Sequence, residues 1–153
     1  MRRALIKQFL EAEGEYVSGG ELASRLGVSR TAVWKQVEAL RKLGYGIEAV
    51  PRKGYRLTER PDRLYPWEVE AVLATERFGR SIEYHESIAS TNDRAKALGV
   101  SGSDEGYVVV AEEQTAGKGR LGRSWISPFA EGLFVSILLR PHIKPHDAPK
   151  LTL

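Results

Sequence analysis

Residues 21–44 read ELASRLGVSRTAVWKQVEALRKLG and decide the fold of the amino-terminal third of the chain. They predict a short helix over residues 21–26, which Gly27 closes. A longer helix follows over residues 30–43, and Ser29 supplies its side-chain cap. A glycine between two helices permits the left-handed backbone of a tight turn. Small and apolar residues would pack the two helices together: Ala23, Val33, Val37 and Leu40. This pattern is typical of a helix-turn-helix.

The segments on either side predict a winged form of this motif. Apolar residues recur at a helical period over residues 2–13, and Gly14 is a natural stop. On the carboxyl side, residues 47–57 read IEAVPRKGYRL, two short β-type runs around a turn that carries Arg52 and Lys53. A hairpin tipped with cations directly after such a helix is typical of the wing, where cations contact DNA phosphates.

The outward face of the longer helix is polar and largely basic, as a helix in a DNA major groove needs to be. With the wing it supplies a set of candidate DNA-binding residues: Ser29, Arg30, Thr31, Lys35, Arg52, Lys53 and Arg56. The alternative is a three-helix bundle whose charges are merely solvated. The coincidence of the turn, the basic face and the basic wing favours DNA binding. Trp34 receives no DNA role, because a lone helical Trp is more often a packing residue.

Charge and composition set further limits. Residues 1–60 carry 12 Lys and Arg against 7 Asp and Glu, whereas residues 61–153 carry 11 against 13, so the positive charge belongs to the first third. The chain has no cysteine and only three scattered histidines, which excludes a disulfide framework and predicts no metal site. No run approaches the ~20 apolar residues of a bilayer span. We therefore expect a cytoplasmic protein with no membrane partner.

A second domain is expected after a linker. Residues 58–66, TERPDRLYP, combine two prolines with charge and show no periodicity. This predicts domains over residues 1–60 and 67–153, joined by a linker over residues 61–66. The elements expected beyond it are a helix from near Pro66 to before Gly79, a strand over 81–88, a short helix capped by Ser90 or Thr91 and ending at Gly99, and strands over 107–114 and 132–141. Mixed strands with short helices indicate an α+β fold.

Residues 114–125, QTAGKGRLGRSW, contain a G-x-G-x-x-G pattern whose context decides its chemistry. A Walker A loop would need glycine at Glu112 and Ser or Thr at Gly119. A dinucleotide-binding loop needs a helix directly after it and an acidic residue about 20 positions on. Here the sequence RSWISPF, directly after the loop, disfavours a helix, and Ile137 stands where the acidic residue would be needed. A protein-kinase loop needs Val where Ser124 stands. None of the three known loops fits.

What remains is a flexible cationic loop flanked by strands. Its glycines would let backbone N–H groups approach an anion, while Lys118, Arg120 and Arg123 supply positive charge. Such a loop suits a short-lived ligand that carries two anionic groups.

This loop, the following SPFAEGLFVSILLRP and the preceding STN at Ser90–Asn92 resemble the biotin protein ligases, whose loop follows a G-R-G-R-x-G-R-x-W pattern. The winged helix resembles the bifunctional branch of that family, which also represses biotin genes. The resemblance covers essentially the whole chain. It implies a winged helix-turn-helix followed by a partial biotin/lipoate-ligase-like catalytic domain of mixed α+β fold. It also implies an ATP-dependent ligase that makes biotinyl-5′-AMP and passes the biotinyl group to a lysine of a biotin carboxyl carrier protein.

The resemblance assigns a role to each matching residue. Lys118 and Arg120 would be the catalytic cations between the biotin carboxylate and the α-phosphate. Biotin would contact Ser90, Thr91, Asn92, Gln114, Lys118, Gly119 and Arg120. The adenylate would contact Gly117, Lys118, Arg120, Arg123 and Trp125. The implied ligands are biotin and ATP with Mg²⁺. The implied partners are the carrier domain, operator DNA and, as a candidate, a second copy of the chain in a homodimer.

Alternatives stay open at several of these positions. Ser90 is also a suitable helix cap, Trp125 a suitable core residue, and Arg123 a suitable solvated charge. Lys118 replaces the family's usual arginine, which keeps the charge but loses the bidentate fork, so we expect looser anion binding. The chain stops at PKLTL, where the family's catalytic domain continues with further strands. The alternative function is therefore an inactive winged-helix transcriptional regulator with a ligand-sensing or dimerising remnant.

Overall fold

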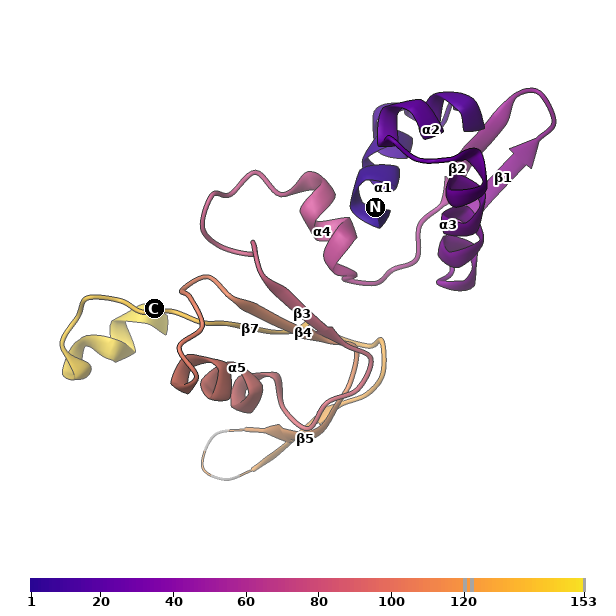
Figure 1. Cartoon of the computed structure of the whole chain (residues 1–153). Helices are drawn as coiled ribbons and strands as arrows, with labels where there is room; N and C mark the ends of the chain where they lie inside the picture. Colours follow the sequence, from indigo (N-terminus) through magenta and orange to yellow (C-terminus); the bar gives the residue numbers. More distant parts are fainter. Residues whose placement is uncertain (120, 122, 153) are drawn as a thin grey trace. The chain divides into compact units, whose positions relative to one another are not determined.

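The computed structural model describes residues 1–119, 121 and 123–152, and its contacts divide the chain into two units, Met1–Ala74 and Thr75–Leu153 (Figure 1). The observed division lies beyond the linker that the sequence places over residues 61–66. The difference arises because the segment after residue 60 packs within the first unit. The predicted α+β class is confirmed, with a helix-turn-helix first and mixed sheets after it.

Three helices build the core of the first unit: α1 (Arg2–Glu11), α2 (Gly19–Leu26) and α3 (Arg30–Lys42). Ser18 Oγ accepts the Glu21 N–H at 3.0 Å, and Ser29 Oγ accepts the Ala32 N–H at 3.1 Å, so serines cap both α2 and α3. Gly27 ends α2 in the left-handed conformation, with φ at 64°. The core side chains of these helices are fully buried: Leu5, Ile6, Phe9, Leu22, Val33, Val37 and Leu40.

An antiparallel hairpin forms the wing, with β1 (Gly46–Val50) paired to β2 (Gly54–Glu59). A Cβ on Gly54 would lie 2.1 Å from the carbonyl oxygen of Val17, and its φ is 113°, so only glycine fits. Val17 and Tyr55 exchange two backbone hydrogen bonds, of 2.8 and 2.9 Å. These bonds fasten the wing to the segment that precedes α2.

Helix α4 (Pro66–Val72) also belongs to the first unit. Tyr65, which precedes it, is buried. Glu68 is only 6% exposed, accepts a hydrogen bond of 2.6 Å from the Tyr45 hydroxyl and pairs with Arg60. Burial and then the bond to Glu68 raise the pKa of Tyr45 above its usual range. The buried carboxylate therefore has both a neutral and a charged donor, as a buried charge requires.

The predicted helix that ends before Gly79 is wrong in its second half, because α4 ends at Val72. Leu73 leaves the helix with an extended backbone, at φ −68° and ψ 118°. Gly79 N–H donates instead to the carbonyl oxygen of Gly106 at 2.9 Å, which joins this segment to the turn before the next strand. Helical propensity is a weak preference, and backbone pairing with a distant segment overrides it.

A three-stranded sheet forms the centre of the second unit, in the order β3-β4-β7. Its strands are β3 (Ile82–His85), β4 (Val108–Ala111) and β7 (Phe134–Ile137), all shorter than predicted. Helix α5 (Thr91–Val100) connects the parallel pair β3 and β4, and β7 is antiparallel to β4. The helix lies over one face of the sheet (Figure 1), where Ala95 and Leu98 pack with Val109.

The segment predicted as a flexible loop is mostly a hairpin. β5 (Gln114–Lys118) pairs with β6 (Ser124–Ser127) in antiparallel fashion. A Cβ on Gly117 would lie 2.6 Å from the carbonyl oxygen of Trp125, so this glycine permits the close approach of the two strands. The loop prediction is therefore wrong for these strands, because their backbone groups pair with each other. A 3-10 helix, η2 (Pro145–Thr152), follows the sheet.

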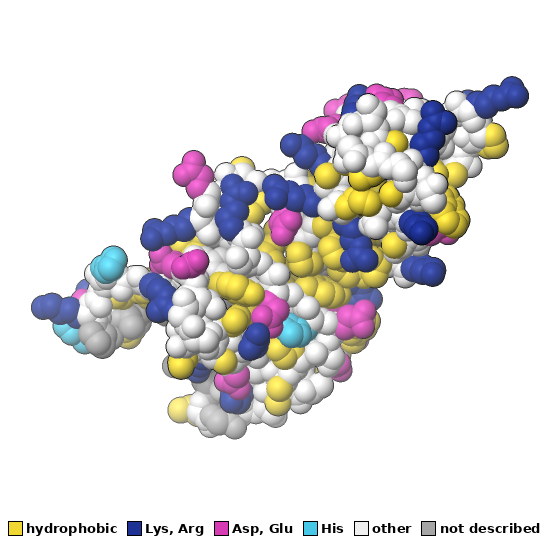
Figure 2. Space-filling view, viewed as in Figure 1, with side chains coloured by type: hydrophobic (Ala, Val, Ile, Leu, Met, Phe, Trp, Pro, Cys, Tyr) yellow, Lys and Arg dark blue, Asp and Glu magenta, His cyan; other side chains and the backbone are white. Residues whose placement is uncertain are grey.

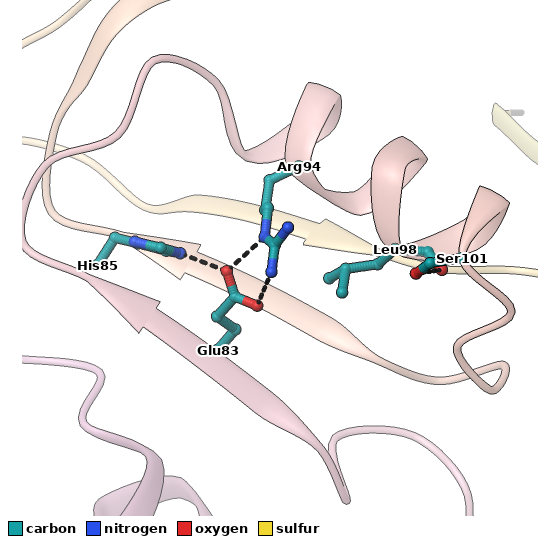
Figure 3. Close-up of polar contacts among 5 residues, drawn as sticks. All are labelled: Glu83, His85, Arg94, Leu98 and Ser101. Carbon is teal, nitrogen blue, oxygen red and sulfur yellow. Dashed lines mark hydrogen bonds and ion pairs between the residues drawn. The ribbon is translucent and has the colours of Figure 1, made fainter.

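An ionic cluster ties β3 to α5 (Figure 3). The Arg94 guanidinium donates to both carboxylate oxygens of Glu83, at 2.7 and 2.9 Å, and His85 Nε2 lies 2.6 Å from the same carboxylate. The hydrogen bond from Arg94 is the main cause that lowers the pKa of Glu83 below its ordinary value. The bidentate pair therefore links the first half of α5 to the neighbouring strand.

The described part of the chain offers neither a cluster of metal ligands nor a membrane-spanning helix. No group of three or more His, Asp or Glu side chains there is arranged to hold a metal ion. None of the helices there is both long and apolar enough to cross a bilayer.

Candidate functional site

The site begins at the amino-terminal end of α5. Ser90 caps the helix, with its Oγ accepting the Asp93 N–H at 3.3 Å. Thr91 is only 4% exposed and donates twice to Gln114 Oε1, from its N–H at 2.9 Å and from its hydroxyl at 3.0 Å. A parallel bridge between Ile88 and Gln114 brings β5 alongside the segment that enters the helix. Three predicted biotin contacts from distant parts of the sequence thus lie together.

Two serines outside the predicted set complete this polar network. Ser136 Oγ, on β7, donates to Thr91 Oγ1 at 2.9 Å. Gln114 Nε2 donates to Ser127 Oγ, on β6, at 3.3 Å. Ser136 interrupts the otherwise apolar run LFVSILL, a signal that was present in the sequence. Ser127 carries no such signal, because only the register of the hairpin places it opposite Gln114.

The network orients the amide of Gln114. Its Oε1 accepts two hydrogen bonds from Thr91, so its nitrogen faces Ser127, to which it donates at 3.3 Å. Buried polar groups are stable only when they are paired, which holds these side chains in one arrangement. Hydroxyls and an amide at such short range present both donors and acceptors.

Two other predicted biotin contacts, Asn92 and Gly119, lie outside the polar network around Thr91. Asn92 is exposed, and its side chain makes no hydrogen bond with the residues that the structure describes. Gly119 N–H donates to the carbonyl oxygen of Arg123 at 2.7 Å, so the turn of the hairpin already uses this donor. Neither residue therefore joins the network around Thr91.

Lys118 stands at the end of β5, beside the first turn of α5. Its Nζ lies 2.6 Å from Asp93 Oδ2, and 66% of the Lys118 side chain is exposed. The hydrogen bond from this ammonium is the main cause that lowers the pKa of Asp93. The predicted catalytic cation is therefore next to the helix that carries the predicted biotin contacts, and its charge is already paired with Asp93.

The remaining residues of the cationic segment fall into two groups. Arg120 and Gly122 lie outside the described residues. Arg123 is exposed, in agreement with either a ligand contact or a solvated charge. Trp125 is 63% exposed, so the alternative that it is a core residue is wrong. Its indole ring lies on the surface of β6, accessible to an aromatic ligand.

The DNA-binding candidates on α3 are accessible: Arg30, Thr31 and Lys35 are all exposed. Ser29 serves first as the cap of this helix. A cleft of about 530 Å³ lies between the start of α2 and the wing, and its lining includes Ser18, Arg30 and Arg52. Two cations and the first N–H groups of a helix favour an anion in such a cleft.

The three cations predicted on the wing are not equivalent. Arg52 and Lys53 are exposed in the turn, and Figure 2 shows dark blue side chains at the outer end of this unit. Arg56 instead lies 2.6 Å from the Glu48 carboxylate and 4.8 Å from the ring centre of Tyr16. Because Glu48 neutralises it, we expect Arg56 to attract phosphate less than the two turn residues do.

Two protein families match the chain, one in each unit. Residues 2–56 match the HTH domain family, and residues 84–152 match the biotin/lipoate A/B protein ligase family. The chain thus joins a segment similar to helix-turn-helix domains to a segment similar to biotin/lipoate protein ligases. The resemblance drawn from the cationic loop and the STN motif is thereby confirmed.

Individual relatives agree with this assignment. Over all 153 residues the chain is 45% identical to the bifunctional ligase/repressor BirA of Bacillus subtilis, and it covers 47% of that protein. It is 37% identical over 148 residues, 94% of its length, to BirA of Escherichia coli K12, of which it covers 43%. The chain is also 48% identical over 52 residues to the probable transcription repressor NiaR of Thermotoga maritima. This match covers 34% of the chain and 29% of that protein. The chain spans about half the length of the BirA relatives it matches.

Proposed function

We propose that this protein acts in biotin ligation and in biotin-responsive repression through operator DNA. In the first step a carboxylate oxygen of biotin attacks the α-phosphorus of ATP, which enters with Mg²⁺, and pyrophosphate leaves. In the second, a lysine amine of a biotin carboxyl carrier domain attacks the acyl carbon of biotinyl-5′-AMP. The amine loses a proton and AMP leaves. The observation that supports this most is the polar network around Thr91, beside the cation Lys118.

In this proposal the two ends of biotin meet different chemistry. The ureido ring would bind the hydroxyls and amide around Thr91 and Gln114, which present donors and acceptors together. The carboxylate at the other end must approach a phosphate of like charge. Lys118 and Arg120 would lower that repulsion by lying between the two anions. Closure of the hairpin over the mixed anhydride would keep water away from it.

The repressor half of the proposal belongs to the first unit. We propose that α3 lies in the major groove, with Arg30 and Lys35 directed to the DNA. Arg52 and Lys53 would contact phosphates from the wing. The exposure of these four side chains supports this arrangement.

Biotin-dependent exchange of pyrophosphate into ATP tests the ligase half. Arg120→Ala is expected to lower the exchange rate roughly 10²-fold, because it removes a charge from the region of the reacting anions. Arg80→Ala, which removes an exposed arginine elsewhere in the same unit, is the matched control and should leave the rate unchanged. Full exchange by the Arg120 variant would contradict the role given to this cationic segment.

A second candidate is a transcriptional regulator whose ligase segment only senses a ligand or dimerises. The exposed cations on α3 and the polar network around Thr91 support it, since such a regulator needs a DNA-facing surface and a place for a small ligand. Calorimetry with biotin on the 153-residue chain separates the two. Biotin binding without exchange would support the regulator, exchange would support the ligase, and absence of both would contradict each of them.

A further inference from the structure

Tyr16 lies shortly before α2, in the segment that pairs with the wing. Val17 and Tyr55 form an antiparallel bridge, which brings Tyr16 beside Arg56 on β2. Arg56 in turn lies opposite Glu48 on β1. Side chains alternate between the two faces of an extended segment, so Val17 is buried while Tyr16 lies on the other face, with Arg56 and Glu48.

The Tyr16 ring contacts two cations of the wing. The Arg56 guanidinium lies 4.8 Å from the ring centre, and the Lys53 ammonium lies 5.6 Å from it. Both distances are within the roughly 6 Å at which the face of an aromatic ring attracts a cation. The Tyr16 hydroxyl shares a hydrogen bond with Glu48, which is the main cause that raises the pKa of Tyr16 and lowers that of Glu48. The ring is therefore fixed by backbone pairing at one end and by a carboxylate at the other.

The wing holds these two cations in different ways. Arg56 lies 2.6 Å from the Glu48 carboxylate, which offsets its charge. Lys53 is exposed, and the ring beside it is neutral, so the contact orients the lysine and leaves its positive charge intact. Glu48 adds a weaker attraction, the smallest of the causes that lower its own pKa. An ammonium has three N–H donors, so a ring on one side leaves donors for a phosphate oxygen on the other.

Such a contact makes phosphate binding by Lys53 less costly. A lysine side chain is flexible and loses conformational freedom when it binds a partner. A ring that already holds the ammonium near its bound position lowers this cost, so binding becomes tighter without a new contact to the DNA.

We propose that Tyr16 is a positioning residue for DNA binding: its ring holds the Lys53 ammonium where the wing meets a DNA phosphate. This rests on the proposed function, which directs the turn of the wing to DNA. Tyr16 acts through Lys53 and needs no contact of its own with the duplex.

Fluorescence anisotropy with a labelled duplex of mixed sequence tests this role on the full 153-residue chain, because phosphate contacts do not depend on base sequence. Tyr16→Leu should weaken binding about two- to fivefold, the effect expected for an exposed cation–π contact. Tyr16→Phe keeps the ring and should bind as the unmodified chain does. In a Lys53→Met background, Tyr16→Leu should have no further effect.

A general loosening of the wing predicts a different outcome. It would also displace Arg52, so Tyr16→Leu would weaken binding in the Lys53→Met background as well. That result, or equal weakening by Tyr16→Phe and Tyr16→Leu, would overturn the positioning role.

Nuclear magnetic resonance tests the contact without DNA. The ring current of Tyr16 should shift the ε-methylene protons of Lys53 upfield of those of Lys144, an exposed lysine of the second unit. The shift should persist in Tyr16→Phe and vanish in Tyr16→Leu, and its absence from the unmodified chain would overturn the proposal. If the shift is present but the unmodified chain binds no duplex, the repressor half of the proposed function fails, and the positioning role fails with it. If the chain binds DNA and the variants do not differ from it, only the positioning role fails.

Discussion

Thr91 joins three segments of the candidate site through one side chain. Its hydroxyl accepts a hydrogen bond from Ser136 on β7 and donates one to Gln114 on β5. The side chain is buried, so water cannot replace these partners easily. A change that removes the hydroxyl should therefore leave polar groups unpaired in the interior, which is more costly than the loss of a solvated hydrogen bond.

Thr91→Val is expected to lower the free energy of unfolding by about 1–3 kcal/mol, because it keeps the shape of the side chain and removes both hydrogen bonds. Urea denaturation monitored by tryptophan fluorescence measures this. Thr115→Val makes the same chemical change on an exposed face of β5 and should shift the stability by no more than about 0.5 kcal/mol. Equal effects of the two substitutions would mean that the network does not stabilise the fold.

Because Glu83 is paired with Arg94, we expect the stability of the folded protein to depend on pH. Arg94 lowers the pKa of Glu83 in the folded protein below the ordinary value of 4.5. The folded state therefore binds fewer protons at this group, and its stabilisation is present above pH 4.5 and is lost as the pH falls through the folded pKa. The melting temperature of Glu83→Gln should thus lie below that of the unmodified chain at pH 7 and approach it at low pH. A difference that stays constant with pH would contradict this origin.

Among the described elements, the wing and the β5–β6 hairpin carry the cations that the proposed function assigns to ligands. The wing separates its cations by local pairing: Arg56 is held by Glu48, whereas Arg52 and Lys53 are exposed in the turn, with the Lys53 ammonium 5.6 Å from the ring centre of Tyr16. Phosphate contacts release counterions, so each cation that contacts DNA steepens the salt dependence of binding. The structure therefore predicts which wing residues dominate that dependence.

Replacement of Arg52 and Lys53 together by Ala should make the slope of log affinity against log salt shallower by about 2, since each lost phosphate contact removes about 0.9. Fluorescence anisotropy with a labelled operator duplex at several salt concentrations gives the slope. Arg25→Ala is the control, because this arginine on α2 is paired with Glu21. If both variants left the slope unchanged, we would conclude that the wing does not contact DNA phosphates.

At the scale of the whole molecule, α4 defines where the first unit ends. Trp67 stacks on Tyr65 with ring centroids 4.7 Å apart, and the Arg2 guanidinium lies 4.8 Å from the Trp67 ring. The Tyr45 hydroxyl accepts a hydrogen bond of 2.9 Å from the Trp67 indole and donates one to Glu68. Residues that the sequence analysis assigns to the end of the linker and the start of the second domain thus pack on the winged helix.

An isolated fragment of residues 1–74 should therefore be more stable than a fragment of residues 1–60. The shorter fragment loses Trp67 and Glu68, the hydrogen-bond partners of Tyr45. A loss of about 1 kcal/mol lowers the melting temperature of a domain this small by about 4–8 °C. Thermal unfolding followed by far-ultraviolet circular dichroism compares the two. Equal melting temperatures would show that α4 adds nothing to the first unit.

Features that depend on residues close together in the sequence were predicted correctly before the fold was known. The two serine caps, the glycine turn and the apolar stripe of α3 are set by residues a few positions apart, because a helix repeats every 3.6 residues. The STN motif and the cationic segment also identified the ligase relationship from adjacent residues. The polar site was predicted in part, since Ser90, Thr91 and Gln114 do lie together.

Features that depend on pairing between distant segments could be read only from the fold. The strand character of residues 114–118 comes from hydrogen bonds to β6, and the roles of Ser127 and Ser136 come from strand register. The burial of Glu68 and the pairing of Asp93 with Lys118 likewise join residues far apart in the chain. The physical reason is that a strand or an ion pair is completed by its partner, and a one-residue shift in register would give each side chain a different neighbour.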